Sequence, residues 1–228
     1  MLSCEGKITS EECAKVLETF QPNKTPGNDG IPIELYKTFW PLISDPFIRC
    51  VNECFEKGAR EMSSSQKQAV ITLIEKKGKD RSFLENWRPI SLVNVDAKIM
   101  SKVLATRIKN VFPNIIHHNK SGFVEDRYIG ETVRSIFDLM DFTLKENIPG
   151  LLNFIDFHKA FDSIEWNYLV NCLEAFRFGP DIIRWVKTLY KNIQSCVVNN
   201  GLTTGYFTLE RGVRQGGSLV SLFIRSCS

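Results

Sequence analysis

The first sixty residues carry the apolar spacing of amphipathic helices. Within residues 9–20, apolar side chains recur every three or four positions, and Thr9 and Ser10 before them are both possible helix caps. Residues 34–40 and 45–58 show the same spacing, and Gly58 marks the end of the second stretch. We therefore expect three helices here, separated by turns rich in proline, glycine and asparagine.

Strand signals follow in the middle of the chain. Residues 68–75 show an alternation of polar and apolar side chains and are rich in β-branched residues. They therefore predict a strand that enters a hairpin turn at 76–80. Apolar positions return to helical spacing over 95–108, with lysine and arginine on the other faces, and again over 129–146. The apolar run LLNFIDF at 151–157 has the length of a strand.

The last third of the chain also contains both helix-like and strand-like spacing of apolar residues. Helices are predicted over 165–178 and 181–192, divided by a Gly-Pro pair. A hairpin is predicted over 195–209, because the sequence Asn-Asn-Gly at 199–201 favours a tight turn. Helices interspersed with a few short strands predict an α+β (α/β) fold.

The composition is that of an ordinary globular protein of one or two domains. Hydrophobic residues make up 43% of the 228 positions and charged residues 24%, which excludes disordered and collagen-like chains. The seven cysteines are odd in number and form no CxxC pair, which favours free thiols in a reducing compartment. Cys50 and Cys54 would share one helix face, but their spacing matches no zinc pattern.

Neither a secretory leader nor a membrane span is predicted. The first thirty residues carry charges every few positions and lack an apolar core. No uncharged apolar run approaches the ~18 residues that cross a bilayer. We therefore expect an intracellular protein, nuclear or cytoplasmic, that is not secreted and has no membrane partner.

Basic residues concentrate in the middle of the chain. Residues 66–109 contain ten basic and four acidic side chains, although the net charge of the whole chain is only +3. A dense positive segment suits a polyanionic partner, because each phosphate contact releases condensed counterions. A solvated helix face followed by a charged turn would give the same composition, so the charges leave both interpretations open.

Asp156 is the ionisable residue inside the apolar run at 151–157. A carboxylate among apolar neighbours is costly to desolvate, so it is expected to be paired, protonated or bound to a cation. Asp162, in the segment KAFDS, has the simpler interpretation of a cap or packing residue before a helix that starts near Glu165.

Several blocks of sequence follow one another along most of the chain. They are TPGNDGIPIELYK at 25–37, ITLIEKKGKD at 71–80, NWRPISLVNVDAKIMSKVLATRI at 86–108, SGFVEDRYIGETVRSI at 121–136, NFIDFHKAFDSIEWNYL at 153–169 and RGVRQGGSL at 211–219. In this order they resemble the reverse transcriptase of non-long-terminal-repeat retrotransposons, the long interspersed element type.

The resemblance implies fingers and a partial palm of a right-hand polymerase. It implies an N-terminal helical extension at 1–60, fingers at 61–149 and a partial palm at 150–228 without a thumb, helix-rich with a small antiparallel palm sheet. In this family, two Mg²⁺ ions assist the attack of a primer 3′-hydroxyl on the α-phosphate of a nucleotide. The implied partners are an RNA template, a DNA primer and deoxynucleotide triphosphates.

The palm motifs carry the residue roles that the resemblance implies. Asp156 matches the first catalytic aspartate and, with the backbone carbonyl of Phe157, the metal ligands. Phe161 matches the bulky residue that blocks a ribose 2′-hydroxyl, although packing in the core is the usual fate of a phenylalanine. Gln215 and Gly216 match the position beside the nucleotide and template, where glycine permits close backbone approach.

The fingers blocks add basic residues. Arg88 matches an arginine that clamps the incoming triphosphate, a task suited to its planar fork of donors. The lysines of the predicted turn, Lys76, Lys77 and Lys79, would assist as nucleic-acid contacts. A surface arginine and a solvated loop are the ordinary alternatives.

The sequence also departs from the family pattern. Lys120 stands where a glutamine is usual, and Gly217-Ser218 replaces the usual Asp-Pro. The aromatic-Ala-Asp-Asp block that carries the remaining catalytic carboxylates is missing from these 228 residues. We therefore expect a truncated polymerase with an incomplete metal site that is inactive alone. A non-catalytic RNA- or DNA-binding module and a decayed element product without function are the alternatives.

Overall fold

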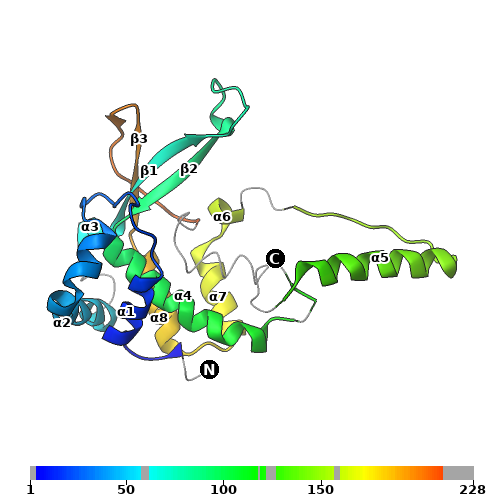
Figure 1. Ribbon diagram of the computed structural model, residues 1–228, viewed down its shortest axis with the longest axis horizontal. Helices are drawn as coiled ribbons and strands as arrows, with labels where there is room; N and C mark the ends of the chain where they lie inside the picture. The colour runs from blue at the N-terminus through cyan, green and yellow to red at the C-terminus, as the bar shows by residue number, and fades with distance from the viewer. Residues whose placement is uncertain (1–3, 58–61, 118, 122–126, 157–159, 213–228) are drawn as a thin grey trace.

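The computed structural model describes residues 4–57, 62–117, 119–121, 127–156 and 160–212, which form a mixed α+β fold. Helices gather at one end and a small sheet projects from them (Figure 1). The helices are α1 (Ser10–Glu18), α2 (Ile33–Lys57), α3 (Ser64–Lys67), the 3₁₀ turn η2 (Leu84–Asn86), α4 (Val95–Ile115), α5 (Ile129–Lys145), α6 (Ala160–Ser163), α7 (Trp166–Ala175) and α8 (Pro180–Tyr190). The strands are β1 (Gln68–Glu75), β2 (Trp87–Val93), β3 (Gln194–Asn199), β4 (Leu202–Thr203) and β5 (Phe207–Thr208).

The predicted cap of the first helix is confirmed. The Thr9 hydroxyl accepts a hydrogen bond from the Glu12 backbone N–H, and the Glu12 carboxylate accepts one from the Thr9 N–H. This reciprocal capping box satisfies two donors that the first turn of α1 would otherwise leave unpaired. Helices predicted over 95–108, 129–146, 165–178 and 181–192 also appear, as α4, α5, α7 and α8.

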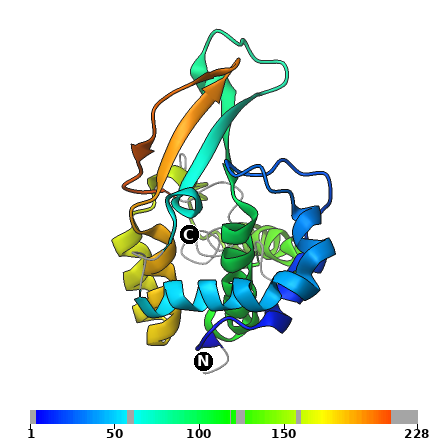
Figure 2. The same cartoon turned by 90° about the vertical axis from the view of Figure 1, so that its left-hand side faces the viewer.

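The prediction of two separate helices over 34–40 and 45–58 is wrong, because α2 runs through both. Pro41 and Pro46 lie inside it, and each lacks the N–H of a normal helical residue. The rings of Tyr36 and Phe47 lie 6.1 Å apart, whereas a straight helix would separate them by about 16 Å. The prolines therefore bend α2 without ending it, and Figure 2 shows its halves running in different directions.

The sheet has the strand order β2-β1-β3-β4, and β5 pairs with β3. β1 and β2 form the predicted antiparallel hairpin, with a register from Ala69↔Val93 to Glu75↔Trp87. The β3–β4 hairpin is also confirmed, because Asn200 and Gly201 both adopt positive φ at its turn.

The sheet is mixed, so the prediction of a small antiparallel palm sheet is wrong in this respect. β3 runs parallel to β1, and Gln68 faces Gln194 in the register. Parallel neighbours need a long connection, and here more than a hundred residues of chain, including the five α-helices α4 to α8, separate the two strands. The β1–β2 hairpin, predicted to belong to the fingers, and the β3–β4 hairpin, predicted to belong to the palm, are therefore parts of one sheet.

The strand expected at 151–157 is not formed by residues 151–156, which are extended but pair with no described strand. Leu151, Phe154 and Ile155 are 93%, 80% and 75% exposed. An apolar segment becomes a strand only when a neighbour takes up its N–H and C=O groups, and the local pattern carries no information about that neighbour. The preceding helix, α5, also buries none of its side chains and extends away from the other helices (Figure 1).

One apolar core joins the N-terminal helices to α4, α7 and α8. The ring of Phe55 on α2 stacks on that of fully buried Trp185 on α8, with 4.6 Å between the centroids. α4 is buried along most of its length, including Ile99, Leu104 and Ile108. Of the helices in the described part of the chain, none has the length and hydropathy to span a bilayer.

Candidate functional site

The segments that carry the two predicted palm motifs meet around Gly212. The Gly212 backbone N–H donates to the Ile164 carbonyl at 2.8 Å, and the Trp166 indole N–H donates to the Gly212 carbonyl at 2.8 Å. Glu165 and Arg211 form an antiparallel β-bridge between the same segments. Residues about fifty positions apart are thereby fixed beside each other.

Gly212 fits this junction because it has no side chain. Its φ is +82°, a region that L residues rarely adopt, and an added Cβ would lie 3.0 Å from the Asp162 carbonyl oxygen. The glycine of the RGVRQGG segment therefore permits a close approach to α6.

Asp162 belongs to α6 itself, so its interpretation as a cap of the following helix is wrong. The N-cap of α7 is Glu165, whose side chain makes no capping bond. The Asp162 side chain is exposed, and its backbone packs against Gly212. An N-cap lies directly before the first helical residue, whereas Asp162 lies inside α6, four positions before α7 begins at Trp166.

A groove of about 420 Å³ lies beside this junction, between the sheet and α6. Ile71 of β1 and Pro89 and Ser91 of β2 line it from the sheet, Asp162 lines it from α6, and residues 207–212 close it. Ile71 pairs with Ser91 across the two strands, so these side chains share one face. The groove thus lies between the β1–β2 hairpin and the segments of both predicted palm motifs.

The groove does not include Arg88. Arg88 is exposed on β2, paired with Ile74, and successive side chains of a strand point to opposite faces. Arg88 therefore lies on the face opposite Pro89 and Ser91. Its role in binding a triphosphate stays a prediction.

The remaining predicted palm residues lie at or beyond the limits of the described chain. Asp156 is exposed at the end of the extended segment 151–156. Phe157, Gln215 and Gly216 fall outside the described residues, and so does the side chain of Phe161, although its backbone belongs to α6. In the sequence, Gln215 follows Gly212 by three residues.

The described residues do not complete a magnesium site. Among them, no three or more His, Cys, Asp or Glu side chains gather where a metal ion would bind. Mg²⁺ in phosphate chemistry takes one or two carboxylates together with phosphate oxygens and water. Asp156 is an exposed carboxylate of the kind that such a site uses, and its assignment as a magnesium ligand stays a prediction.

The β1–β2 hairpin projects from the molecule and carries the predicted basic turn at its tip (Figures 1 and 2). Lys76 has a structural role, because its ammonium donates to the Glu85 carbonyl at 2.8 Å. Lys77 and Lys79 are exposed and form no ion pair with any described residue. Two of the three predicted lysines are therefore available to a partner.

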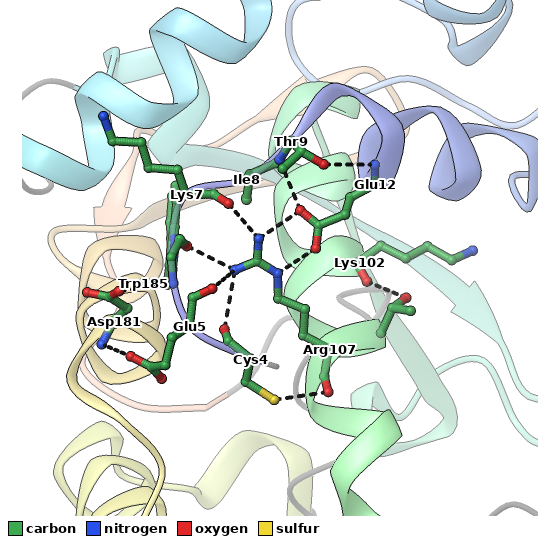
Figure 3. Close-up of polar contacts among 12 residues, drawn as sticks. Cys4, Glu5, Lys7, Ile8, Thr9, Glu12, Lys102, Arg107, Asp181 and Trp185 are labelled. Carbon is green, nitrogen blue, oxygen red and sulfur yellow. Dashed lines mark hydrogen bonds and ion pairs between the residues drawn. The ribbon is translucent and has the colours of Figure 1, made fainter. Parts of the chain in front are cut away.

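The most extensive polar network of the described chain surrounds Arg107, which the apolar spacing over 95–108 predicts on an outer face of its helix. Arg107 is 7% exposed. Its guanidinium donates to the backbone carbonyls of Gly6 at 2.9 Å and Lys7 at 2.6 Å, and to both carboxylate oxygens of Glu12 (Figure 3). Through these hydrogen bonds Arg107 links the N-terminal segment to α4. Residues three apart share a helix face, so its position three residues after buried Leu104 indicates that Arg107 is buried.

The charge of Glu12 is stabilised by this network. Burial alone would raise the pKa of Glu12, but the hydrogen bond from Arg107, those from Thr9 and the positive charge of Arg107 outweigh it and lower the pKa from its usual 4.5. Glu12 thus has two roles, closing the capping box of α1 and pairing with Arg107.

Glu5 extends the N-terminal segment to α8. Its carboxylate accepts a hydrogen bond from the Asp181 backbone N–H at 2.8 Å, and the Asp181 carboxylate accepts one from the Gly6 N–H at 2.9 Å. An anion at this end of α8 is favourable because the first turn leaves N–H groups unpaired. Gly179 makes room for Glu5, since an added Cβ would lie within 2.6 Å of three of its carboxyl atoms.

The TPGNDG block packs against the start of α4 around Asn94, a residue with no distinguishing signal in the sequence. Asn94 is 1% exposed, and its side-chain amide N–H donates to the Ser65 hydroxyl at 2.8 Å, while its side-chain Oδ1 accepts a hydrogen bond from the Asp29 backbone N–H at 3.4 Å. An added Cβ at Gly27 would overlap the Asn94 backbone. The blocks at 25–37 and 86–108 thus contact each other through the side-chain amide of Asn94.

Comparison with known proteins agrees with this combination of motifs. Residues 74–227 match the family model described as reverse transcriptase (RNA-dependent DNA polymerase). The chain is 37% identical over 224 residues to the transposon TX1 uncharacterized 149 kDa protein of Xenopus laevis, a match that covers 96% of this chain and 17% of that protein. It is 23% identical over 220 residues to the RNA-directed DNA polymerase from mobile element jockey of Drosophila funebris, covering 93% of this chain and 23% of the relative.

A third relative is the putative 115 kDa protein in the type-1 retrotransposable element R1DM of Drosophila melanogaster, 24% identical over 69% of this chain and 16% of its own length. The chain belongs to the reverse transcriptase family. Within it, the chain is a domain related to the polymerases of non-long-terminal-repeat retrotransposons. It spans about a fifth of the length of these relatives.

Proposed function

We propose that this chain supplies the fingers and the first part of the palm of an RNA-directed DNA polymerase of a non-long-terminal-repeat retrotransposon. The supporting observation is the junction at Gly212, which holds the motifs at 153–169 and 211–219 together beside the groove. In the proposed division, residues 1–60 support the fingers at 61–149 and the palm at 150–228. Its partners are an RNA template, a DNA primer and deoxynucleotide triphosphates.

In this proposal the palm residues surround the reacting nucleotide. The Asp156 carboxylate and the Phe157 carbonyl hold Mg²⁺, which supplies charge stabilisation for phosphoryl transfer when bound. Phe161 excludes a ribose 2′-hydroxyl, and Gln215 and Gly216 lie against the base pair being formed. The position of Phe161 inside α6, next to groove-lining Asp162, supports this role.

The basic residues of the fingers hold polyanions in this proposal. Arg88 clamps the triphosphate by forked hydrogen bonds, and Lys77 and Lys79 contact nucleic-acid phosphates from the hairpin tip. Lys76 contributes its charge to the same surface while holding the loop through Glu85. The exposure of Arg88, Lys77 and Lys79 supports these assignments.

We propose further that the 228-residue chain does not polymerise alone, because a two-metal reaction needs several carboxylates and the described residues offer no such cluster. Primer extension on an RNA template tests this, with Mg²⁺ or Mn²⁺ and the purified chain. We expect no product above background. Extension that Asp156→Asn abolishes would contradict the proposed inactivity while supporting the role of Asp156.

A non-catalytic nucleic-acid-binding module is the second candidate. The observation that favours it is the projecting hairpin, whose exposed lysines make no ion pair with described residues. Such a module would bind RNA with a strong salt dependence and would be indifferent to Asp156→Asn. Loss of magnesium-dependent deoxynucleotide binding in Asp156→Asn would instead favour the polymerase role.

A further inference from the structure

The outer surface of α7 and α8 carries a second groove that has no part in the proposed polymerase site. Its volume is about 460 Å³. Three basic side chains of α8 and its C-cap line it, together with Glu174 of α7 and the apolar Ile183. The basic residues are Arg184, Lys187 and Lys191. The groove therefore has an excess of positive charge.

The three cations form a row along one helix face. Arg184 and Lys187 are three residues apart and Lys187 and Lys191 four, so they lie on neighbouring turns and span about 10 Å along the axis. The opposite face of α8 is apolar and buried, with Ile182, Trp185 and Val186 in the core. Packing thus fixes the direction in which the basic row points.

In the described part of the chain no ion pair neutralises this row, and Glu174 is the one acidic side chain that lines the groove. All three side chains are exposed, and none forms an ion pair with a described residue. The Arg184 guanidinium lies over the Phe55 ring, 5.0 Å from its centroid, which holds its position without cancelling its charge. Like charges three or four residues apart on a helix repel each other, so a bound polyanion would relieve a repulsion that is present in the folded chain.

We propose that this groove binds the phosphate backbone of a single-stranded RNA segment outside the polymerase site. A row of cations on a fixed helix face suits a linear polymer of regularly spaced phosphates. Among the described residues that line the groove none is aromatic, so binding rests on phosphates rather than stacked bases and is independent of sequence.

The position of the groove separates it from the fingers. α8 lies at the helical end of the molecule and the tip of the β1–β2 hairpin at the other end, as Figures 1 and 2 both show. Arg184, Lys187 and Lys191 therefore contact a different stretch of RNA from the one that Lys77 and Lys79 contact. The inference adds an RNA-holding surface to the proposed function and does not depend on the role of Asp156.

The test measures the affinity of the full 228-residue chain for labelled oligouridylate between about 50 and 200 mM salt, by fluorescence anisotropy. The variant Arg184→Gln/Lys187→Gln/Lys191→Gln removes the row. Each phosphate contact with a single strand contributes about 0.7 to the slope of log affinity against log salt, so we expect the slope to become shallower by about 2. Lys187→Gln alone should make the slope shallower by about 0.7.

The matched control is Arg49→Gln/Lys15→Gln/Lys145→Gln, which removes the same charge from exposed positions on α1, α2 and α5. Thermal melting verifies that each variant is folded. Equal slopes for the groove variant and the control would overturn the proposal.

Two further outcomes decide the nature of the partner and the independence of the groove. Competition by polyglutamate as effective as that by polyuridylate would overturn the proposal in favour of an acidic protein. If Lys77→Gln/Lys79→Gln abolished the effect of the groove substitutions, the groove would not be a separate contact. Additive changes in slope would support it.

Discussion

Gly212 shows how one backbone position joins two distant motifs. Its φ is positive, and an added Cβ would lie only 3.0 Å from the Asp162 carbonyl oxygen. Both features favour a residue without a Cβ. The sequence identified the RGVRQGG segment through its resemblance, but the contact with α6 could not be predicted, because it depends on how residues fifty positions apart fold back on each other.

Gly212→Ala should lower the free energy of unfolding by about 1–3 kcal/mol, since the alanine would sit in a disfavoured backbone region and press on Asp162. Urea denaturation followed by circular dichroism measures this loss. Gly205→Ala is the matched control, because an added Cβ there meets nothing within 4 Å and we expect a change below about 0.5 kcal/mol. Equal stabilities of the two variants would contradict the packing described at Gly212.

Arg107→Met should destabilise the chain by about 3 kcal/mol, because it leaves the Glu12 carboxylate and several backbone carbonyls of the N-terminal segment without their donor. Exposed Arg49→Met is the control, and its effect should stay within about 0.5 kcal/mol. Both are read from denaturant midpoints at neutral pH.

The same variant carries a pH signature. The pKa of Glu12 is lowered in the folded state, so its contribution to stability is fully present above the usual value of 4.5 and is lost as the pH falls through the folded pKa. The stability difference between the wild-type chain and Arg107→Met should therefore shrink below pH 4.5. A difference that stays constant down to pH 3 would indicate that the pair contributes nothing through the charge of Glu12.

Among the elements, those with strong local signals are the ones that the sequence predicts correctly. The threonine cap of α1, the apolar stripe of α8 and the Asn-Gly turn after β3 each lie within a short stretch of chain. The continuity of α2 and the parallel pairing of β1 with β3 could not be predicted, because they depend on ring contacts across two prolines and on residues more than a hundred positions apart.

The β1–β2 hairpin is the element whose function is easiest to isolate. Lys77→Gln/Lys79→Gln should make the salt dependence of RNA binding shallower by about 1.4, because two phosphate contacts are lost and the fold is untouched. Lys15→Gln/Lys145→Gln, at exposed positions on other helices, is the matched pair. An unchanged slope in the hairpin variant would remove the support for a nucleic-acid contact at this tip.

Over the whole molecule, the N-terminal segment is part of the fold that carries the groove. Arg107 and Glu12 tie it to α4, Glu5 ties it to α8, and Phe55 stacks on Trp185. The predicted division at residues 60 and 149 therefore describes proposed roles, while the buried side chains of all three parts share one core. The sequence could assign the family through its motifs, but the residues that hold these parts together lie largely outside the motifs.

The central claim is that the groove beside Gly212 and the fingers hairpin form the nucleotide-binding side of a polymerase. Its most direct test is photo-crosslinking of a deoxynucleotide triphosphate with a photoreactive base to the folded chain, with Mg²⁺ and an RNA–DNA primer–template. We predict attachment to peptides from the hairpin and from the segments at 153–169 and 207–219. Attachment confined to α1, α2 or α8, or none at all by the folded chain, would contradict it.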